Sequence, residues 1–218
     1  MADGDVRTTD TGRVEAFSDA VVAIALTLLV LDLITEHEPG AYVRELLEQW
    51  PTYLAYVAAF LTIASIWLSH HDGFSRLARV DPLVRILNLL LLLGVALVPW
   101  PTALFSSALA EPRGELLDAA GVLADQRAAV VVYVLVSLIV AGAWTAMSTA
   151  IARRQHLVAA PEDVAWFHQN ARLSAASGAV AVTAGIVGWF VPLLALIVFL
   201  LVPLVFFAVT LRAARRTS

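Results

Sequence analysis

The sequence predicts an all-α membrane protein with six transmembrane helices per subunit and no separate soluble domain. Of its 218 residues, 60% are hydrophobic and only 15% are charged, whereas about a quarter of the residues in a soluble domain are charged. The mean hydropathy is +0.82, and the apolar runs reach the roughly 20 residues that one membrane crossing requires. The absence of cysteine excludes disulfide bonds and thiolate metal sites.

Polar segments divide the chain into the predicted helices. Residues 1–12 are expected to form a disordered cytoplasmic N-terminus, residues 13–211 the six-helix transmembrane domain, and residues 212–218 a basic cytoplasmic tail. A short amphipathic segment at 41–50 is expected to lie at the membrane interface, and 107–126 is the longest polar stretch. The six helices are expected at 13–34, 51–70, 83–106, 127–152, 167–189 and 191–211.

Proline and small residues give three of these helices further features. Pro99 and Pro101 predict a break near the end of the third helix, because proline removes a backbone donor. Pro192 follows a tight corner between the last two helices. The fifth helix is rich in Ser, Ala and Gly, which let helices approach closely in lipid. Packing within one subunit and contact between subunits explain this composition equally well.

The distribution of arginine predicts the orientation in the membrane. Basic residues near transmembrane helices are enriched on the cytoplasmic side. The arginines outside acidic segments fall on one side of a six-span arrangement, which places both termini in the cytoplasm and the protein in the plasma (inner) membrane as a multi-pass protein. They are Arg7, Arg13, Arg76, Arg79, Arg85, Arg153, Arg154, Arg172, Arg212, Arg215 and Arg216.

The first helix carries two different faces. Ser18 and Asp19 lie in an otherwise apolar span, and an ionisable group there usually faces the protein interior or water rather than lipid. At 100° per residue, an apolar stripe with a hydroxyl at its edge lies away from this polar pair. The stripe either faces lipid or surrounds a symmetry axis as an apolar constriction. It consists of Ile24, Leu28 and Leu31, with Thr27 at the edge.

A longer pattern in the first half of the chain resembles a known family. Arg13-x-x-x-Phe17-Ser18-Asp19 is followed by an Ala-Ile-x-x-Thr-Leu-Leu run, and the next two helices contain Trp67, the His70-His71 pair and Asn88. This combination, over roughly residues 13–105, resembles the transmembrane protein 175 family of potassium channels.

The resemblance implies a channel domain at 13–211 that assembles as a homotetramer in the lipid bilayer. Its pore lies on the symmetry axis and is lined by the first helix. The hydrophobic constriction falls on Ile24, Leu28 and Leu31, and the selectivity layer falls on Thr27. A ring of Ile24 offers a K⁺ ion no oxygen, whereas Thr27 hydroxyls do, so modest K⁺ over Na⁺ preference is expected. K⁺ is then the permeant ion, and no cofactor is expected.

The resemblance also implies a structural polar network behind the pore, near the cytoplasmic side. We expect this network to fix the first helix against the second and third. Removing one partner of a buried charge is strongly destabilising, so Asp19→Asn should lose assembly or gating control without changing which ion permeates. The expected members are Arg13, Phe17, Ser18, Asp19, Trp67, His70, His71 and Asn88.

Other functions remain open on the residues alone. A secondary transporter or a proton or cation leak pathway fits the hydropathy, although transporters usually have repeats and polar sites at mid-depth. A membrane metalloenzyme would need His70, His71, Asp72, His156 and His168 to converge, yet adjacent histidines on a helix point about 100° apart. A membrane scaffold is a further alternative. We expect no catalytic residues, no metal site and no nucleic-acid partner.

Overall fold

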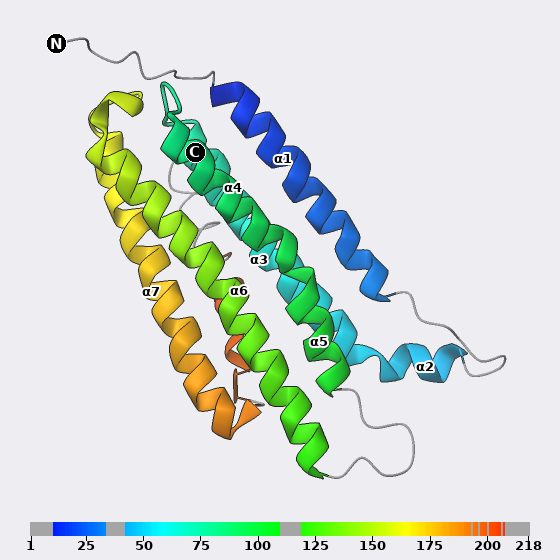
Figure 1. The fold of residues 1–218 in the computed structure, drawn as a ribbon. Helices are drawn as coiled ribbons and strands as arrows, with labels where there is room; N and C mark the ends of the chain where they lie inside the picture. Colours follow the sequence, from blue (N-terminus) through cyan, green and yellow to red (C-terminus); the bar gives the residue numbers. More distant parts are fainter. Residues whose placement is uncertain are drawn as a thin grey trace.

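The computed structural model describes residues 11–33, 42–109, 119–192, 194–195, 197–199, 201–205 and 207. Within these ranges the chain is helical, apart from short turns and an antiparallel bridge between Leu77 and Val158. The long helices lie side by side as a bundle (Figure 1). The predicted all-α membrane architecture is therefore confirmed. The expected tail at 212–218 and all but the last two residues of the expected N-terminal segment 1–12 lie outside the described residues.

Five helical stretches of the described residues are long and apolar enough to cross a membrane. The described residues of the predicted sixth span, from Pro192 to Phe207, are helical as well. The long helices are α1 (Thr11–Leu28), α3 (Trp50–Phe74), α4 (Pro82–Leu97), α6 (Ala119–Arg153) and α7 (Asp163–Phe190), and the short elements are the 3₁₀ helix η1 (Leu29–Leu33), α2 (Tyr42–Glu48), α5 (Pro99–Leu109) and the 3₁₀ helix η2 (Gln155–Leu157).

The predicted break in the third span is confirmed and lies at Val98. Asp81 accepts a hydrogen bond from the Val84 amide at 2.8 Å and so caps α4. The span then stops at Leu97 and resumes at Pro99 as α5. Proline is tolerated in the first turn of a helix because the amide lost there has no helical partner. The break therefore divides one apolar run into two helices.

The predicted boundary that differs most from the structure is the start of the fourth span. The fourth span was expected to begin at 127, but α6 already begins at Ala119. Residues 119–126 contain two polar residues, Asp125 and Gln126, among Ala, Val, Leu and Gly. Alanine and leucine favour helix strongly, so the helix continues beyond the apolar run that the hydropathy pattern detects.

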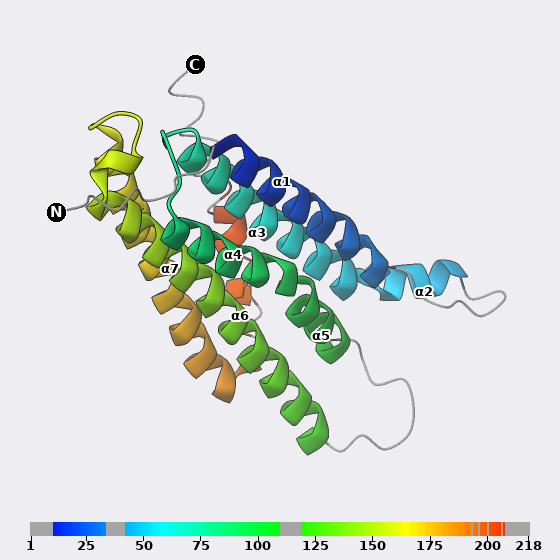
Figure 2. The ribbon, with the colours of Figure 1, turned by 45° about the horizontal axis from the view of Figure 1, so that its top comes forward.

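The long helices pack against one another as a single bundle. α1 packs on α3 and α4, α4 packs on α6, and α6 packs on α7. Figures 1 and 2 show α1 and α7 on opposite sides of the bundle in both views. Small residues permit the closest approaches: a Cβ at Gly94 of α4 would lie 2.7 Å from a methyl group of Val140 on α6. The small residues of the fifth span accordingly serve packing within the subunit at Gly178 and Gly185.

Two loops join at the end of the bundle where α1 begins. We call residues 75–81 and 154–163 the loop clasp. The backbone amide of Ala78 donates to the carbonyl of Leu157 at 2.9 Å. Arg76 pairs with Asp163 at 2.9 Å, and Arg154 Nε lies 3.4 Å from Asp81. These contacts connect the α3–α4 hairpin to the α6–α7 hairpin.

Candidate functional site

The predicted stripe lies on the exposed face of α1. Ile24, Leu28 and Leu31 are 58%, 48% and 55% exposed in the single subunit. The opposite face packs its apolar residues against α3 and α4 through Ala59, Ile63, Leu92 and Val95. The buried residues of that face are Val22, Ala25 and Leu29. A helix that exposes three large apolar residues of this kind requires lipid or another protein surface to cover them.

The stripe becomes straighter where α1 changes to η1. Leu28 ends the α-helix and Leu29–Leu33 form a 3₁₀ helix. With about 3.0 residues per turn, Leu31 lies nearly in line with Leu28 along the axis. The apolar stripe is therefore continuous across the junction.

Thr27 places its hydroxyl at the edge of this stripe. The side chain is exposed, and Oγ1 donates to the carbonyl oxygen of Ile24 at 2.8 Å. Because the hydroxyl proton is used by the helix itself, the lone pairs of Oγ1 are available to a cation or to water. The exposed face of α1 thus combines apolar residues with one oxygen donor to cations.

A buried chain of hydrogen bonds joins α1 to α4 and α3. Ser18 donates to the carbonyl of Val14 at 2.9 Å, Asn88 Nδ2 donates to Ser18 Oγ at 2.9 Å, and His70 Nε2 lies 2.8 Å from Asn88 Oδ1. The direction follows from the first acceptor, because a carbonyl oxygen can only accept. Ser18 must then accept from the amide group of Asn88, and His70 must carry its proton on Nε2. Ser18, His70 and Asn88 are all at most 2% exposed.

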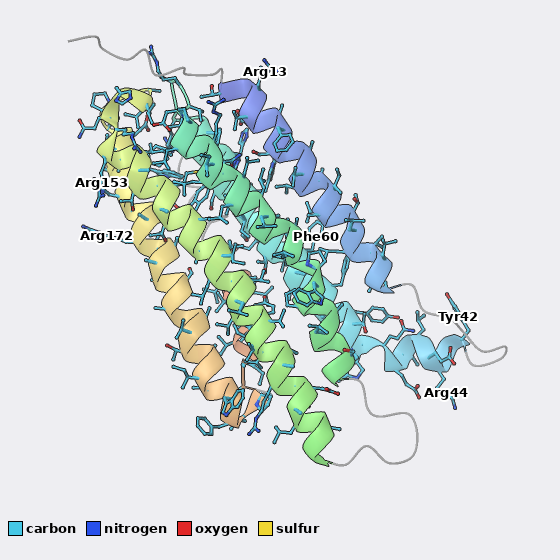
Figure 3. The ribbon with its side chains drawn as sticks, in the orientation of Figure 1. Arg13, Tyr42, Arg44, Phe60, Arg153 and Arg172 are labelled. Atoms are coloured by element: carbon cyan, nitrogen blue, oxygen red, sulfur yellow. The ribbon has the colours of Figure 1, made fainter. Side chains whose placement is uncertain are left out.

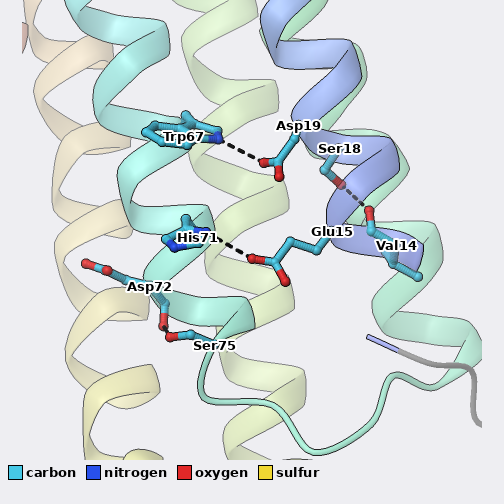
Figure 4. Close-up of polar contacts among 8 residues, drawn as sticks. All are labelled: Val14, Glu15, Ser18, Asp19, Trp67, His71, Asp72 and Ser75. Atoms are coloured by element: carbon cyan, nitrogen blue, oxygen red, sulfur yellow. Dashed lines mark hydrogen bonds and ion pairs between the residues drawn. The ribbon is translucent and has the colours of Figure 1, made fainter. Parts of the chain in front are cut away.

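A second pair of contacts lies one helical turn apart on α1 and α3 (Figure 4). Trp67 Nε1 donates to Asp19 Oδ1 at 2.8 Å. His71 Nδ1 lies 3.0 Å from Glu15 Oε1. The rings of Trp67 and His71 stack with their centroids 5.8 Å apart. The two acids of α1 therefore meet two aromatic donors of α3.

The structure brings together six of the eight predicted network residues. Arg13 and Phe17 are exposed and lie outside the network. Phe17 lies about 100° from Ser18 around the helix, and Arg13 about 140°. Both therefore project toward the side of the Ile24 stripe, where the neighbouring helices of the same subunit cannot reach them.

Sequence reasoning missed Glu15 as a member of the network. The signal was available, because Glu15 and Asp19 are four residues apart, as are Trp67 and His71, and residues four apart share one face of a helix. It also missed the loop clasp, whose partners are distant in the chain and separated by loops.

The described residues contain no group of three or more acidic or histidine side chains that could hold a metal ion. His156 and His168 are exposed, whereas His70 is buried and hydrogen-bonded to Asn88. The metalloenzyme alternative therefore has no site within this part of the chain.

Comparison with known proteins places this geometry in a family. Residues 13–99 match the sequence model of a family described as the endosomal/lysosomal potassium channel TMEM175. A Streptomyces collinus protein named as a potassium channel is 45% identical over 150 residues, which cover 68% of this chain and 68% of that protein. The chain belongs to the TMEM175 family. It is therefore a multi-pass membrane protein of an ion-channel family and not an enzyme.

Other TMEM175 proteins show how far the likeness extends. The crystal structure of a lysosomal potassium-selective channel TMEM175 homologue from Chamaesiphon minutus has a TM-score of 0.68 and 27% identity, and the match covers 92% of this chain and 97% of that one. The bovine endosomal/lysosomal proton channel TMEM175 is 37% identical over 114 residues, 48% of this chain but only 24% of the animal protein. The family motif and the polar network both fall inside the matched first half.

Proposed function

We propose that this protein is a potassium-selective cation channel that conducts passively through a pore on the axis of a homotetramer. The observation that carries the proposal is the exposed face of α1, where Ile24, Leu28 and Leu31 form an apolar stripe beside the Thr27 hydroxyl. Four such faces around one axis bury surfaces that a single subunit leaves uncovered. Closed cyclic symmetry is the usual way for identical subunits to do so.

In this arrangement the two kinds of residue have different tasks. A ring of Ile24 side chains gives an ion no oxygen to replace its hydration water, so a narrow ring is a barrier and a wider one passes a partly hydrated ion. The Thr27 hydroxyls supply oxygens one turn further along. Since Oγ1 already donates its proton to Ile24, its lone pairs stabilise K⁺ or the water around it. Modest selectivity for K⁺ over Na⁺ results.

The orientation proposed is that of a plasma-membrane protein with both termini in the cytoplasm. Arg13, Arg153 and Arg172 lie toward the end of the bundle where α1 begins, whereas Tyr42 and Arg44 lie on α2 near the other end (Figure 3). An excess of arginine on one side supports a cytoplasmic location for that side. The loop clasp then lies in the cytoplasm.

The names of the relatives support K⁺ as the ion and leave a second candidate. The Streptomyces protein is named as a potassium channel and the bovine one as a proton channel. A single file of water in an apolar constriction can also conduct protons, unless an electrostatic barrier excludes them. The same recordings therefore need a pH gradient as well as a K⁺ gradient.

The deciding experiment is planar-bilayer recording of the purified protein in K⁺/Na⁺ gradients. Ile24→Asn should wet the constriction and raise the current, including Na⁺ current. Thr27→Ala should move the reversal potential toward the value of a channel that does not distinguish K⁺ from Na⁺. Thr27→Ser, which keeps the hydroxyl, should leave the reversal potential unchanged. Ile86→Asn is the matched control. It is the same substitution at a residue that is 62% exposed but lies on α4 instead of α1.

Unchanged currents and reversal potentials in both Ile24→Asn and Thr27→Ala would reject the pore assignment. A reversal potential that follows the pH gradient rather than the K⁺ gradient would favour the proton channel. Native mass spectrometry of the same samples checks the tetramer directly, and a monomer would reject the shared axis.

A further inference from the structure

An apolar groove lies between α6 and α7. Of these two helices, α7 is on the side of the bundle opposite α1 (Figures 1 and 2). The volume of the groove is about 410 Å³. Gly185 lets the two helices approach closely, because a Cβ there would lie 2.6 Å from a methyl group of Val134. The large side chains stand to either side of this contact. The groove is lined by Val130, Val131, Val134, Leu135, Val182, Gly185, Ile186, Trp189 and Phe190.

One end of the groove carries a guanidinium group. Arg127 Nε donates to the carbonyl of Trp189 at 2.8 Å, and the Arg127 Cζ lies 5.0 Å from the centroid of the Trp189 ring. Trp189 is 48% exposed and the neighbouring Phe190 is 74% exposed. Among the described residues, no carboxylate pairs with Arg127. A positive charge therefore sits, without a negative partner from this part of the chain, at the mouth of an apolar groove.

The depth of Arg127 is that of a lipid headgroup. Arg127 and Arg153 are 26 residues apart on α6, about 39 Å along the helix axis. The hydrocarbon core is about 30 Å thick and the bilayer with its headgroups about 40–45 Å. If Arg153 lies at one interface, Arg127 lies at the other. Trp189 has the position typical of the aromatic belt, and the groove extends from there toward the bilayer centre.

We propose that the α6–α7 groove is a binding site for an anionic phospholipid, with one acyl chain along the groove and the phosphate against Arg127. Arginine has a planar set of donors that matches phosphate oxygens. With Nε donating to Trp189, the terminal nitrogens are the donors that meet the phosphate. An anionic headgroup is preferred over a zwitterionic one because the ammonium or choline of the latter would bring a second positive charge beside the guanidinium.

The test uses the fluorescence of Trp189 in vesicles that contain a brominated-acyl phospholipid, which quenches a tryptophan in contact with its chain. The purified protein is reconstituted with brominated phosphatidylglycerol or brominated phosphatidylcholine at equal mole fraction. Subtracting the quenching of a Trp189→Phe variant isolates the contribution of Trp189. Both leaflets have the same composition, so the orientation of the protein does not affect the result.

For the wild type we expect Trp189 to be quenched by both lipids, with an apparent affinity about fivefold higher for phosphatidylglycerol, the size of effect that one arginine has at an anionic surface. Arg127→Gln should abolish this preference and keep the quenching by phosphatidylcholine. Arg127→Lys should keep part of the preference. Arg44→Gln is the control, because Arg44 lies toward the same end of the bundle but pairs with Glu48.

Two results would overturn the proposal. Equal preference for phosphatidylglycerol in the wild type and in Arg127→Gln would show that Arg127 does not hold the headgroup. Absence of any quenching of Trp189 would show that protein rather than lipid covers the groove. Neither result bears on conduction through the proposed pore lined by α1, so this proposal and the channel proposal can be rejected independently.

Discussion

Asn88 is the residue through which three helices meet. It donates to Ser18 on α1 and accepts from His70 on α3, while its own backbone belongs to α4. A buried polar group that loses its partner keeps the full cost of its desolvation, about 1–3 kcal/mol. The side chain of Asn88 therefore prevents two such losses at once.

Asn88→Ala should lower the stability of the protein by about 2–4 kcal/mol, because it leaves the Nε2 proton of His70 without an acceptor and Ser18 without a donor. The measurement is the apparent melting temperature in detergent, with an expected drop of roughly 5–15 °C for a chain of this size. Thr183→Ala is the control, since Thr183 is exposed and bonds only its own helix. Equal melting temperatures for the two variants would mean that the chain through Asn88 contributes nothing.

Asp19→Asn should weaken assembly or alter gating without changing which ion permeates. Asp19 accepts from Trp67 behind α1 and does not belong to the exposed stripe. We therefore expect its charge to act on the position of the helix rather than on the ion. Reversal potentials in K⁺/Na⁺ gradients, measured beside the oligomeric mass, check this. A changed ion preference in an intact tetramer would instead place Asp19 in the pore.

At the scale of the element, the close approach of α4 and α6 depends on one glycine. A Cβ at Gly94 would lie 2.7 Å from Val140 Cγ2 and 3.3 Å from the Val140 backbone nitrogen, whereas a Cβ at Gly142 would meet nothing within 4 Å. Both glycines lie inside helices, so the same substitution has opposite consequences at the two positions.

Gly94→Ala should destabilise the protein by about 1–3 kcal/mol through overpacking. Gly142→Ala should stabilise it by about 0.5–1 kcal/mol, because alanine loses less backbone entropy in a helix. Thermal unfolding of both variants beside the wild type is the measurement. Stabilisation by Gly94→Ala would show that α4 and α6 are further apart than the structure places them.

The elements were predictable from the sequence to different degrees. The spans and the break before Pro99 followed from hydropathy and backbone chemistry, and the exposed stripe around Ile24 followed from helical periodicity. The early start of α6 did not, because helix propensity continues past the apolar run. Contacts between distant segments, such as Glu15 with His71 or Arg127 with Trp189, depend on which helices become neighbours. Periodicity within one helix does not contain that information.

At the scale of the whole molecule, polar chemistry is unevenly distributed along the membrane normal. The loop clasp, the two acids of α1 and their partners on α3 all lie toward the end of the bundle where α1 begins. The proposed orientation places this end in the cytoplasm. A chain without cysteine makes this orientation directly testable.

Single cysteines at Ser75 and Ser107 should report opposite sides of the membrane. Both serines are exposed, and each bonds only a carbonyl three residues earlier, so Ser75→Cys and Ser107→Cys are matched changes. In intact cells a membrane-impermeant thiol reagent should label Ser107→Cys, and it should label Ser75→Cys only after permeabilisation. The reverse pattern would invert the proposed topology.

The polar contacts that attach α1 to its neighbours are concentrated near its beginning. Among the described residues, its hydrogen bonds and ion pairs with α3 and α4 involve Glu15, Ser18 and Asp19. From Val22 onward its buried residues belong to an apolar cluster with residues of those helices. The hydrophobic effect that holds such surfaces together is non-directional, so it does not fix the angle between the helices. A tilt of the second half of the helix about this polar base would break none of these hydrogen bonds. In the pore that we propose, such a tilt would widen or narrow the opening at Leu31.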